Sequence, residues 1–342
     1  PDRSPKLARE RRDRTLQKMK ELGWPAAEVD AALAEPIATV APTTPQDSYP
    51  AYLQATRQWL EATLPISTIY GSGLEVHTAL DLVVQETSDE LIPTQLKFLE
   101  RSVGRRGKDP LQAGGAVVSP DSGLLVAAYG GTQLLATDFN RATQARRQAG
   151  SSIKPLVYAM AFAQRDAEGK RLWRADDTVR NDHRVFPNTD GWRPRNVGGK
   201  YTTTSALAMG LAWSQNVATA SLLEELGGPV EFKKWATQLG YDTSAWRDEM
   251  GLALGSGEVT PLEMARFVAT VVADGRLASG RPVVQAVDAG GHVRVSGLYE
   301  RPSVMTPDDA ALTRGVMQLV ITYGTGGSTR GAAGKPGYNG PA

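Results

Sequence analysis

The stretch Arg147-Gln148-Ala149-Gly150-Ser151-Ser152-Ile153-Lys154-Pro155 is the part of the sequence that decides the fold. The apolar run that follows it, residues 156–162, indicates a buried helix. Residues three apart in a helix lie on one face, so Ser151 and Lys154 are expected side by side at the start of this helix. Pro155 has no backbone N–H and fits best in the first turn, which predicts Ser151 at the helix mouth.

A serine beside a lysine can act as a nucleophile with its base. A serine hydroxyl is a poor nucleophile until a base accepts its proton. Lysine can be that base when burial or a second cation lowers its pKa from ~10.4 towards neutrality. Free N–H groups at a helix start favour developing negative charge. The same spacing also occurs on solvated helix faces, so the candidate catalytic roles of Ser151 and Lys154 depend on the rest of the chain.

The composition narrows the possible classes of protein. A chain of 342 residues with 41% hydrophobic residues predicts two or three domains with real cores. A net charge of +1 gives no general case for nucleic acid as a partner. The absence of cysteine excludes disulfides and thiolate metal sites, and the three histidines are scattered singly. We therefore expect no metal site and no cofactor, and the sequence shows neither an apolar run of ~18 residues nor a signal peptide.

The first hundred residues contain two predicted parts. Residues 5–22 and 25–33 read as helices, the first of them strongly basic. Its basic face could bind phosphate groups, but we expect it to be solvated or close to a membrane. Four prolines in residues 36–50 indicate a linker. A helix over 52–64, an alternating strand over 74–78 and a helix over 81–99, broken or bent near Pro93, then predict a small α/β module.

A larger domain is predicted from residue 111 onward. Residues 113–119 and 124–129 read as a hairpin, and residues 165–199 as a long irregular stretch. The remaining predicted elements are strands within 281–295 and helices over 205–213, 217–226, 229–239, 261–272 and 307–320.

Two further fragments follow the Ser-x-x-Lys pair. Ser214-Gln215-Asn216 lies between two predicted helices, where it can point a hydroxyl and an amide into a cleft or serve as an ordinary helix N-cap. Lys335-Pro336-Gly337 lies near the end of the sequence.

In this order the three fragments resemble the motifs of the penicillin-recognising serine enzymes. The sequence around these fragments is similar to class A penicillin-binding proteins, the bifunctional peptidoglycan synthases. The similar segments are residues 138–148, 192–196 and 252–263. The resemblance covers nearly the whole chain. It implies an α/β (α+β) transpeptidase fold of the β-lactamase-like type, with a central, mainly antiparallel sheet flanked by helices.

The resemblance also implies a division into domains. Residues 1–45 would be the end of a glycosyltransferase domain and a linker, and residues 46–110 a small α/β linker domain. Residues 111–342 would be the DD-transpeptidase domain. The family continues with further strands and a helix, so the chain is expected to be a fragment, cut short at its C-terminus.

The family's residue roles can be carried over to the first two motifs. Ser151 would attack the carbonyl of the penultimate D-Ala of a D-Ala-D-Ala stem peptide, with Lys154 as its general base. Ser214 would relay a proton to the leaving amine, and Asn216 would bind the peptide carbonyl. An amine of a second stem peptide would then accept the acyl group, whereas penicillin would leave the serine acylated.

The third motif departs from the family pattern. Lys335 would hold Lys154 neutral and attract the substrate carboxylate, while Gly337 and Tyr338 would bind substrate, the Tyr338 N–H completing an oxyanion hole with the Ser151 N–H. Pro336 stands where the family has a hydroxyl residue. Losing a charge-assisted hydrogen bond costs about 1.5–3 kcal/mol, which predicts weaker or altered recognition.

The resemblance further implies partners and a location. Peptidoglycan stem peptides, a lipid-linked precursor, β-lactam antibiotics and cell-wall synthesis proteins are the expected partners, and nucleic acid is not. The full-length protein would be membrane-anchored and extracytoplasmic, in the periplasm. A β-lactamase, a DD-carboxypeptidase that passes the acyl group to water, and a degenerate domain that binds peptidoglycan or a partner without acylation remain as alternatives.

Overall fold

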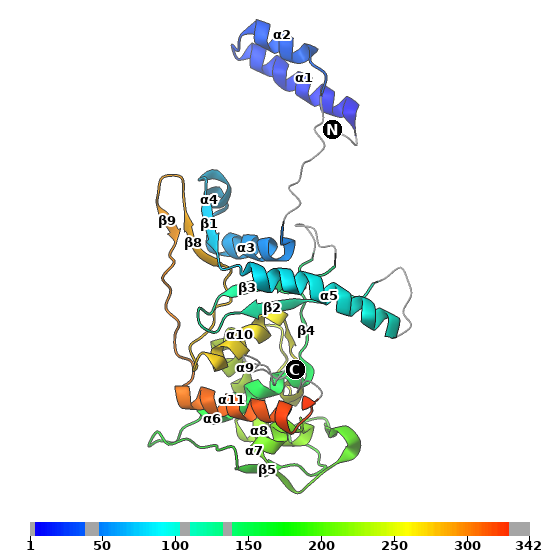
Figure 1. The fold of residues 1–342 in the computed structure, drawn as a ribbon, viewed down its shortest axis with the longest axis vertical. Helices are drawn as coiled ribbons and strands as arrows, with labels where there is room; N and C mark the ends of the chain where they lie inside the picture. The colour runs from blue at the N-terminus through cyan, green and yellow to red at the C-terminus, as the bar shows by residue number, and fades with distance from the viewer. Residues whose placement is uncertain (1–3, 38–47, 103–109, 133–138, 328–342) are drawn as a thin grey trace. The chain divides into compact units, whose positions relative to one another are not determined.

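The computed structural model describes residues 4–37, 48–102, 110–132 and 139–327, which divide into two compact units, Pro1–Ser48 and Tyr49–Ala342 (Figure 1). The described α-helices are α1 (Pro5–Glu21), α2 (Ala26–Ala34), α3 (Pro50–Thr63), α4 (Ile66–Gly71), α5 (Leu82–Ser102), α6 (Lys154–Ala163), α7 (Leu207–Ala212), α8 (Asn216–Glu225), α9 (Gly228–Gln238), α10 (Pro261–Val272) and α11 (Pro307–Thr322). Three 3₁₀ helices are η1 (Gly150–Ile153), η2 (Val197–Gly199) and η3 (Met250–Leu254).

The strands are short and pair in antiparallel fashion. They are β1 (Glu75–Thr78), β2 (Gly115–Val118), β3 (Leu125–Tyr129), β4 (Arg147–Gln148), β5 (Thr178–Arg180), β6 (Thr204–Ala206), β7 (Glu258–Val259), β8 (Val283–Val287) and β9 (Val293–Val295). Among the described residues they form a sheet in the order β1-β8-β9 and the pairs β2-β3, β4-β7 and β5-β6.

The first unit is a pair of helices, as the sequence predicts. The Arg12 guanidinium of α1 donates to the carbonyls of Leu33 and Glu35 at the end of α2. Lys20 forms an ion pair of 2.7 Å with Asp30 across the two helices. These polar contacts join the two helices, and Val29 of α2 is buried. None of the described helices is both long and apolar enough to span a membrane.

In the second unit, β1 shares a sheet with a hairpin from much later in the chain. β1 pairs with β8, with Val76 opposite Ala286, and β8 pairs with β9. Leu60 of α3 packs into a buried core with Val283, Ala286 and Val295. The module predicted within residues 46–110 thus has a sheet whose other strands lie beyond residue 280.

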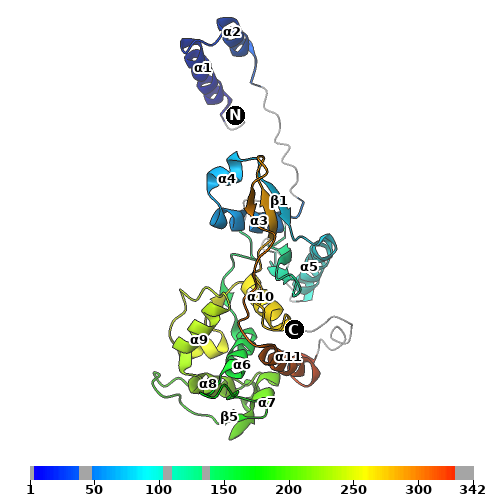
Figure 2. The same ribbon diagram turned by 90° about the vertical axis from the view of Figure 1, so that its left-hand side faces the viewer.

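The β2-β3 hairpin lies between α3 and α5 on one side and α10 on the other (Figures 1 and 2). The buried Tyr52 hydroxyl of α3 lies 2.8 Å from the Leu125 carbonyl of β3. Gln85 of α5 forms a reciprocal amide pair with the backbone of Ala128. These buried polar contacts fix α3 and α5 on the hairpin, because a buried polar group without its partner is costly. α5 continues through Pro93, where the sequence predicts a break or bend.

The main core of the second unit surrounds α6. Nine of its ten residues are buried, from Lys154 to Phe162, and α7, α8, α9 and α11 contact it. A helix that is apolar on all sides needs neighbours on all sides. The run that follows Ser151 in the sequence is therefore the central helix of this helical layer (Figure 2).

The predicted helix over 205–213 is wrong at its start. Residues Thr204–Ala206 form the strand β6, and the helix α7 begins only at Leu207. The partner of β6 is β5, which lies within residues 165–199, the stretch predicted to be irregular. The helix α4 and the two-residue pair β4-β7 were not predicted from the sequence. Strand pairing is decided by partners that lie elsewhere in the chain, which local periodicity does not reveal.

Candidate active site

The backbone before Ser151 is held by a strand pair and a close glycine contact. β4 pairs with β7, and the Ala149 and Gly150 N–H groups donate to the carbonyls of Gly257 and Gly255. Gly255 has φ of +82°, and any side chain there would collide with the backbone of Gly150. The position of Ser151 is thus fixed by a contact that requires glycine at position 255.

Ser151 and Lys154 differ sharply in exposure. Ser151 lies in η1, the single 3₁₀ turn before α6, and is exposed. Lys154 is the first residue of α6 and is fully buried, with Pro155 in the first turn. The Ser151 hydroxyl is therefore exposed, while the Lys154 side chain lies inside the fold.

The Lys154 amine is held by neutral groups. Its Nζ donates to the Ser214 carbonyl at 2.6 Å, to Ser214 Oγ at 3.0 Å and to Asn216 Oδ1 at 2.7 Å. In the described part of the chain no carboxylate forms an ion pair with it. Burial lowers the pKa of Lys154 to about 7. The amine can therefore be neutral near physiological pH, as a general base must be.

The turn between α7 and α8 places Ser214 and Asn216 against this amine. Ser214 has φ of +50°, an uncommon conformation for a residue other than glycine. Its N–H donates to the Leu211 carbonyl, which closes the end of α7. The Asn216 Nδ2 group donates to the carbonyl of Arg195 at 2.7 Å, which turns Oδ1 towards Lys154.

Asn196 supports this turn, and the sequence analysis assigned it no role. Its Oδ1 accepts from the N–H of Val217 at 3.0 Å, in the first turn of α8. Its Nδ2 donates to Asn181 Oδ1 at 2.8 Å. No local sequence signal marks Asn196, because the residue lies 21 positions before Val217 and only the fold brings its buried amide to a free N–H group at the start of α8.

Ser151 and Ser214 line one cleft of about 500 Å³, here called the Ser151 cleft. Its walls are largely apolar and come from α10 and α11, with Met264, Val268 and Met317 among them. Such a cleft excludes water from part of a ligand and leaves a few polar groups to orient it.

The third predicted motif lies outside the described residues. Lys335, Pro336, Gly337 and Tyr338 belong to residues 328–342, so their predicted roles stay predictions. Within the described residues, no group of three or more His, Asp or Glu side chains is placed to hold a metal ion.

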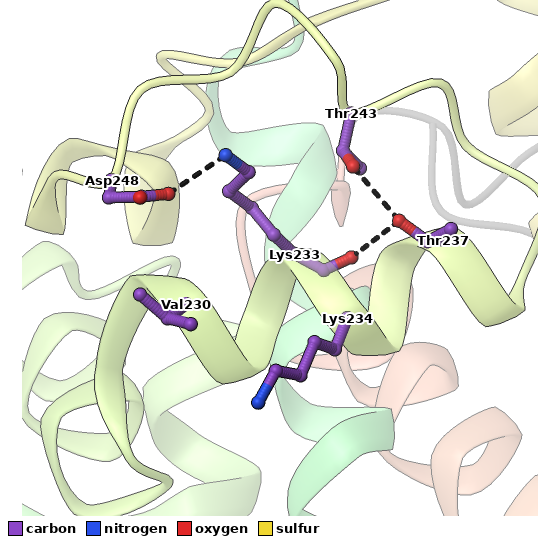
Figure 3. Close-up of a pocket in the computed structure, with 6 residues that line it drawn as sticks. All are labelled: Val230, Lys233, Lys234, Thr237, Thr243 and Asp248. Carbon is purple, nitrogen blue, oxygen red and sulfur yellow. Dashed lines mark hydrogen bonds and ion pairs between the residues drawn. The ribbon is translucent and has the colours of Figure 1, made fainter.

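A separate hollow lies against α9 (Figure 3). Two of its lining residues are lysines that already form ion pairs, Lys233 with Asp248 at 2.8 Å and Lys234 with Glu231 at 2.6 Å. None of the candidate catalytic side chains lines this hollow. The Ser151 cleft is therefore the better candidate for an active site.

Comparison with known proteins identifies the family. Residues 114–340, well over half of the chain, match the penicillin-binding protein transpeptidase domain. The chain belongs to this family. The serine-lysine pair and the Ser-x-Asn turn both lie within the matched region.

Curated relatives extend the match towards the N-terminus. Penicillin-binding protein 1B of Escherichia coli is 28% identical over 95% of this chain, and that of Vibrio cholerae is 30% identical over the same share. Penicillin-binding protein 1A of Neisseria gonorrhoeae is 31% identical over 64% of this chain. The chain spans about two fifths of the length of the two 1B proteins, 38% and 41%. The predicted homology to class A penicillin-binding proteins is confirmed over the transpeptidase region.

Solved structures confirm the predicted fold. Penicillin-binding protein 1A of Haemophilus influenzae superposes with a TM-score of 0.65, covering 94% of this chain and 65% of that one at 20% identity. PonA1 of Mycobacterium tuberculosis in complex with penicillin V superposes with a TM-score of 0.64 over 81% of this chain and 72% of that one, at 25% identity. The chain therefore has the mixed helix-and-strand architecture predicted from its sequence.

Proposed function

We propose that this transpeptidase forms a serine acyl-enzyme with D-Ala-D-Ala stem peptides and cross-links peptidoglycan. The observation that carries the proposal is the buried Lys154 amine, bonded to Ser214 and Asn216 beneath the cleft that Ser151 lines. A lysine with its pKa near 7 and no bonded carboxylate among the described residues is a competent base. The alternative use of a buried lysine, a structural ion pair, would need an acidic partner.

Each side chain of the site has a proposed step. Neutral Lys154 takes the proton of Ser151 Oγ as the hydroxyl oxygen bonds to the carbonyl carbon of the penultimate D-Ala. The C–N bond to the last D-Ala then breaks, and the proton passes through Ser214 Oγ, 3.0 Å from Lys154 Nζ, to the leaving amine. Asn216 bonds the substrate's peptide carbonyl through its amide, once the Arg195 carbonyl is exchanged for the ligand.

The C-terminal motif completes the proposal. Lys335 would attract the terminal carboxylate of the substrate, and the Tyr338 N–H, next to Gly337, would stabilise the oxyanion with the Ser151 N–H. Pro336 removes the hydroxyl that would bond the carboxylate. We therefore expect weaker substrate recognition than with threonine at this position.

The setting of the whole protein follows from the same proposal. The stem peptides are presented on glycan strands built from a lipid-linked precursor, so the working protein would be membrane-anchored and extracytoplasmic, beside other cell-wall synthesis proteins. β-Lactam antibiotics would acylate Ser151 in place of the peptide.

The test is intact-mass spectrometry of the chain after incubation with benzylpenicillin. One penicilloyl adduct is expected, present for many minutes, and absent in Ser151→Ala. The matched control is Ser152→Ala, which removes the neighbouring exposed hydroxyl and should still form the adduct. A chain that is folded by circular dichroism yet forms no adduct would contradict the proposal.

One observation favours a second candidate function. Pro336 breaks the third motif, as expected in a domain that binds peptidoglycan or a partner protein without acylation. Pro336→Thr separates the two possibilities, because only an impaired enzyme would acylate faster after the change. An adduct lost within minutes would instead indicate a β-lactamase, and hydrolysed peptide as the sole product a DD-carboxypeptidase.

A further inference from the structure

A second depression, here called the arginine groove, adjoins the Ser151 cleft. It has a volume of about 630 Å³, and Arg141, Arg146 and Arg147 are among its lining residues. It shares Ser152, Pro261 and Met264 with the Ser151 cleft, so the two hollows adjoin next to Ser151. Among the described residues that line the groove there is no aspartate or glutamate.

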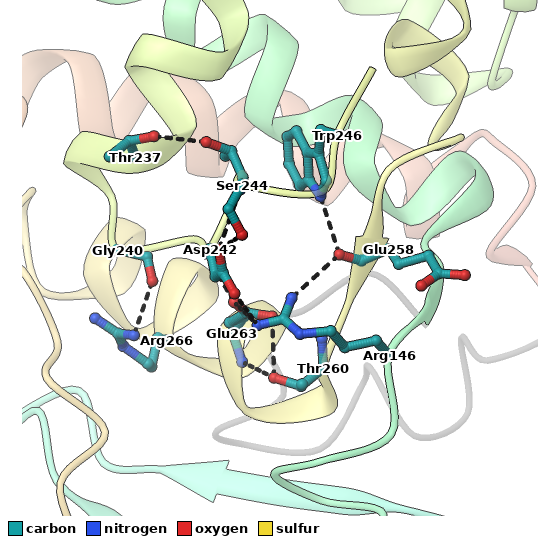
Figure 4. Close-up of polar contacts among 11 residues, drawn as sticks. Arg146, Thr237, Gly240, Asp242, Ser244, Trp246, Glu258, Thr260, Glu263 and Arg266 are labelled. Atoms are coloured by element: carbon teal, nitrogen blue, oxygen red, sulfur yellow. Dashed lines mark hydrogen bonds and ion pairs between the residues drawn. The ribbon is translucent and has the colours of Figure 1, made fainter. Parts of the chain in front are cut away.

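One of the three arginines is already neutralised by acidic partners. Arg146 donates to Asp242 at 3.0 Å and to Glu263 at 3.3 Å (Figure 4). Glu263 also closes the capping box of α10 by accepting from the Thr260 N–H. Arg146 therefore ties the segment before β4 to the start of α10, and its charge serves the fold.

The other two arginines have no acidic partner among the described residues. Arg141 and Arg147 form no ion pair with any carboxylate in the described ranges, and Arg147 is exposed on β4. Two guanidinium groups without a described carboxylate partner, both beside one groove, give it a local positive potential despite the net charge of only +1.

The chain holds the Arg141 guanidinium in a defined place. Its Nη1 donates to the Gly130 carbonyl at 3.3 Å, and the group lies 5.9 Å from the ring centroid of Phe139. A Cβ at position 131 would lie 2.7 Å from Nη1, and one at Gly114 would lie 2.7 Å from the Arg141 carbonyl. Glycine at both positions leaves the room that Arg141 occupies, so the side chain is oriented before any ligand arrives.

We propose that the arginine groove binds the carboxylates of the acyl acceptor, a second stem peptide, through Arg141 and Arg147. This inference rests on the proposed function. The acceptor amine bonds to the acyl carbon, the bond from that carbon to Ser151 Oγ breaks, and the amine proton returns to Oγ. Guanidinium groups recognise carboxylates in a paired, planar geometry, which orients the acceptor beside the ester.

The groove suits the acceptor better than the donor. The donor must place its scissile carbonyl on Ser151, beside Ser214 and Asn216, and none of these three residues lines the groove. The groove instead lies along β4 and the first turn of α10. An acceptor held there approaches the acyl-enzyme without displacing the donor, and it excludes water from that side.

A direct binding measurement tests the groove without requiring catalysis. The probe is L-alanyl-γ-D-glutamyl-L-lysine, which has two carboxylates and an acceptor amine but no D-Ala-D-Ala. By titration calorimetry at low ionic strength, Arg141→Gln/Arg147→Gln should bind it about tenfold more weakly than the unchanged chain. The control Arg57→Gln removes an exposed arginine of α3 and should bind it as the unchanged chain does. When both carboxylates of the probe are amidated, the unchanged chain and the double variant should bind it with equal affinity.

Product partitioning tests the role as an acceptor site. With a D-Ala-D-Ala pentapeptide donor and the same tripeptide, the ratio of cross-linked to hydrolysed product should fall about tenfold in the double variant, per Ser151 acylated. The inference would be overturned if the double variant and Arg57→Gln bound the tripeptide with equal affinity and gave an equal ratio of cross-linked to hydrolysed product. It would also be overturned if the unchanged chain did not bind the tripeptide. A chain that binds the tripeptide but is not acylated by benzylpenicillin would overturn the proposed function and leave the groove as a peptide-carboxylate site.

Discussion

Lys154→Ala is expected to lower the rate of Ser151 acylation by benzylpenicillin by about 10²- to 10⁴-fold, the usual contribution of a general base. The physical reason is the environment of the amine. Lys154 is fully buried, and its Nζ reaches Ser214 Oγ and Asn216 Oδ1. Without the Lys154 amine, Ser151 loses its proton acceptor. Ser214 Oγ and Asn216 Oδ1 also lose the hydrogen-bond donor that orients them.

The measurement is the time course of adduct formation by intact mass at saturating benzylpenicillin. Lys154→Arg is the matched variant, because it keeps the positive charge but cannot lose its proton near neutrality. If Lys154 acts as a base, both variants are slow. Acylation of Lys154→Arg within about threefold of the unchanged chain would show that charge alone suffices, and would contradict the assignment.

The same assay against pH gives a second expected result. Burial lowers the pKa of Lys154 to about 7, and the amine must be neutral to accept a proton. The acylation rate should therefore rise about tenfold per pH unit below pH 7 and level off above it. A rate that is flat between pH 5 and pH 8 would mean that Lys154 titrates elsewhere or does not act as the base.

Asp309→Ala should lower the free energy of unfolding by about 3–5 kcal/mol, the cost of breaking a buried ion pair by removing one partner. The Asp309 carboxylate is 2% exposed and bonds both Arg165 and Arg171 at 2.7 Å. Both guanidinium groups also donate to the Phe162 carbonyl near the end of α6. The substitution would therefore leave two cations uncompensated and loosen the contact between α6 and α11, which line and support the Ser151 cleft.

Thermal unfolding followed by circular dichroism measures this effect, with Asp308→Ala as the control. Asp308 lies in the same first turn of α11 but is exposed, so its loss affects only the helix dipole, by about 0.3–1 kcal/mol. A fall in Tm no larger than that of Asp308→Ala would contradict the role of Asp309.

The pH dependence of Asp309 has a defined sign. Burial raises the pKa of Asp309, but the hydrogen bonds from Arg165 and Arg171 outweigh it and hold the pKa below its usual value. A depressed carboxyl pKa means that the stabilisation is full at neutral pH and is lost as the carboxylate is protonated. The difference in stability between the unchanged chain and Asp309→Ala should therefore narrow only below about pH 4.

Much of the site could be predicted where the signals are local. The apolar run after Lys154 predicts a buried helix, and the structure places that helix at the centre of the main core. A base at Lys154 requires a lowered pKa, and burial of the amine lowers the pKa of Lys154 to about 7. The proximity of Ser214 and Asn216 to Lys154 was predicted from the family resemblance. The sequence of residues 151–216 alone does not indicate which turns lie next to each other in the fold.

Tertiary structure decided what depends on partners distant in sequence. The pairing of β1 with β8, and of β5 with β6, could not be deduced from either strand alone, since a short strand is stabilised by its neighbours. In the sequence, nothing distinguishes the charges of the three arginines near Ser151. Only the fold places Asp242 and Glu263 against Arg146 and leaves Arg141 and Arg147 unpaired within the described residues, because charge compensation is a property of positions in space.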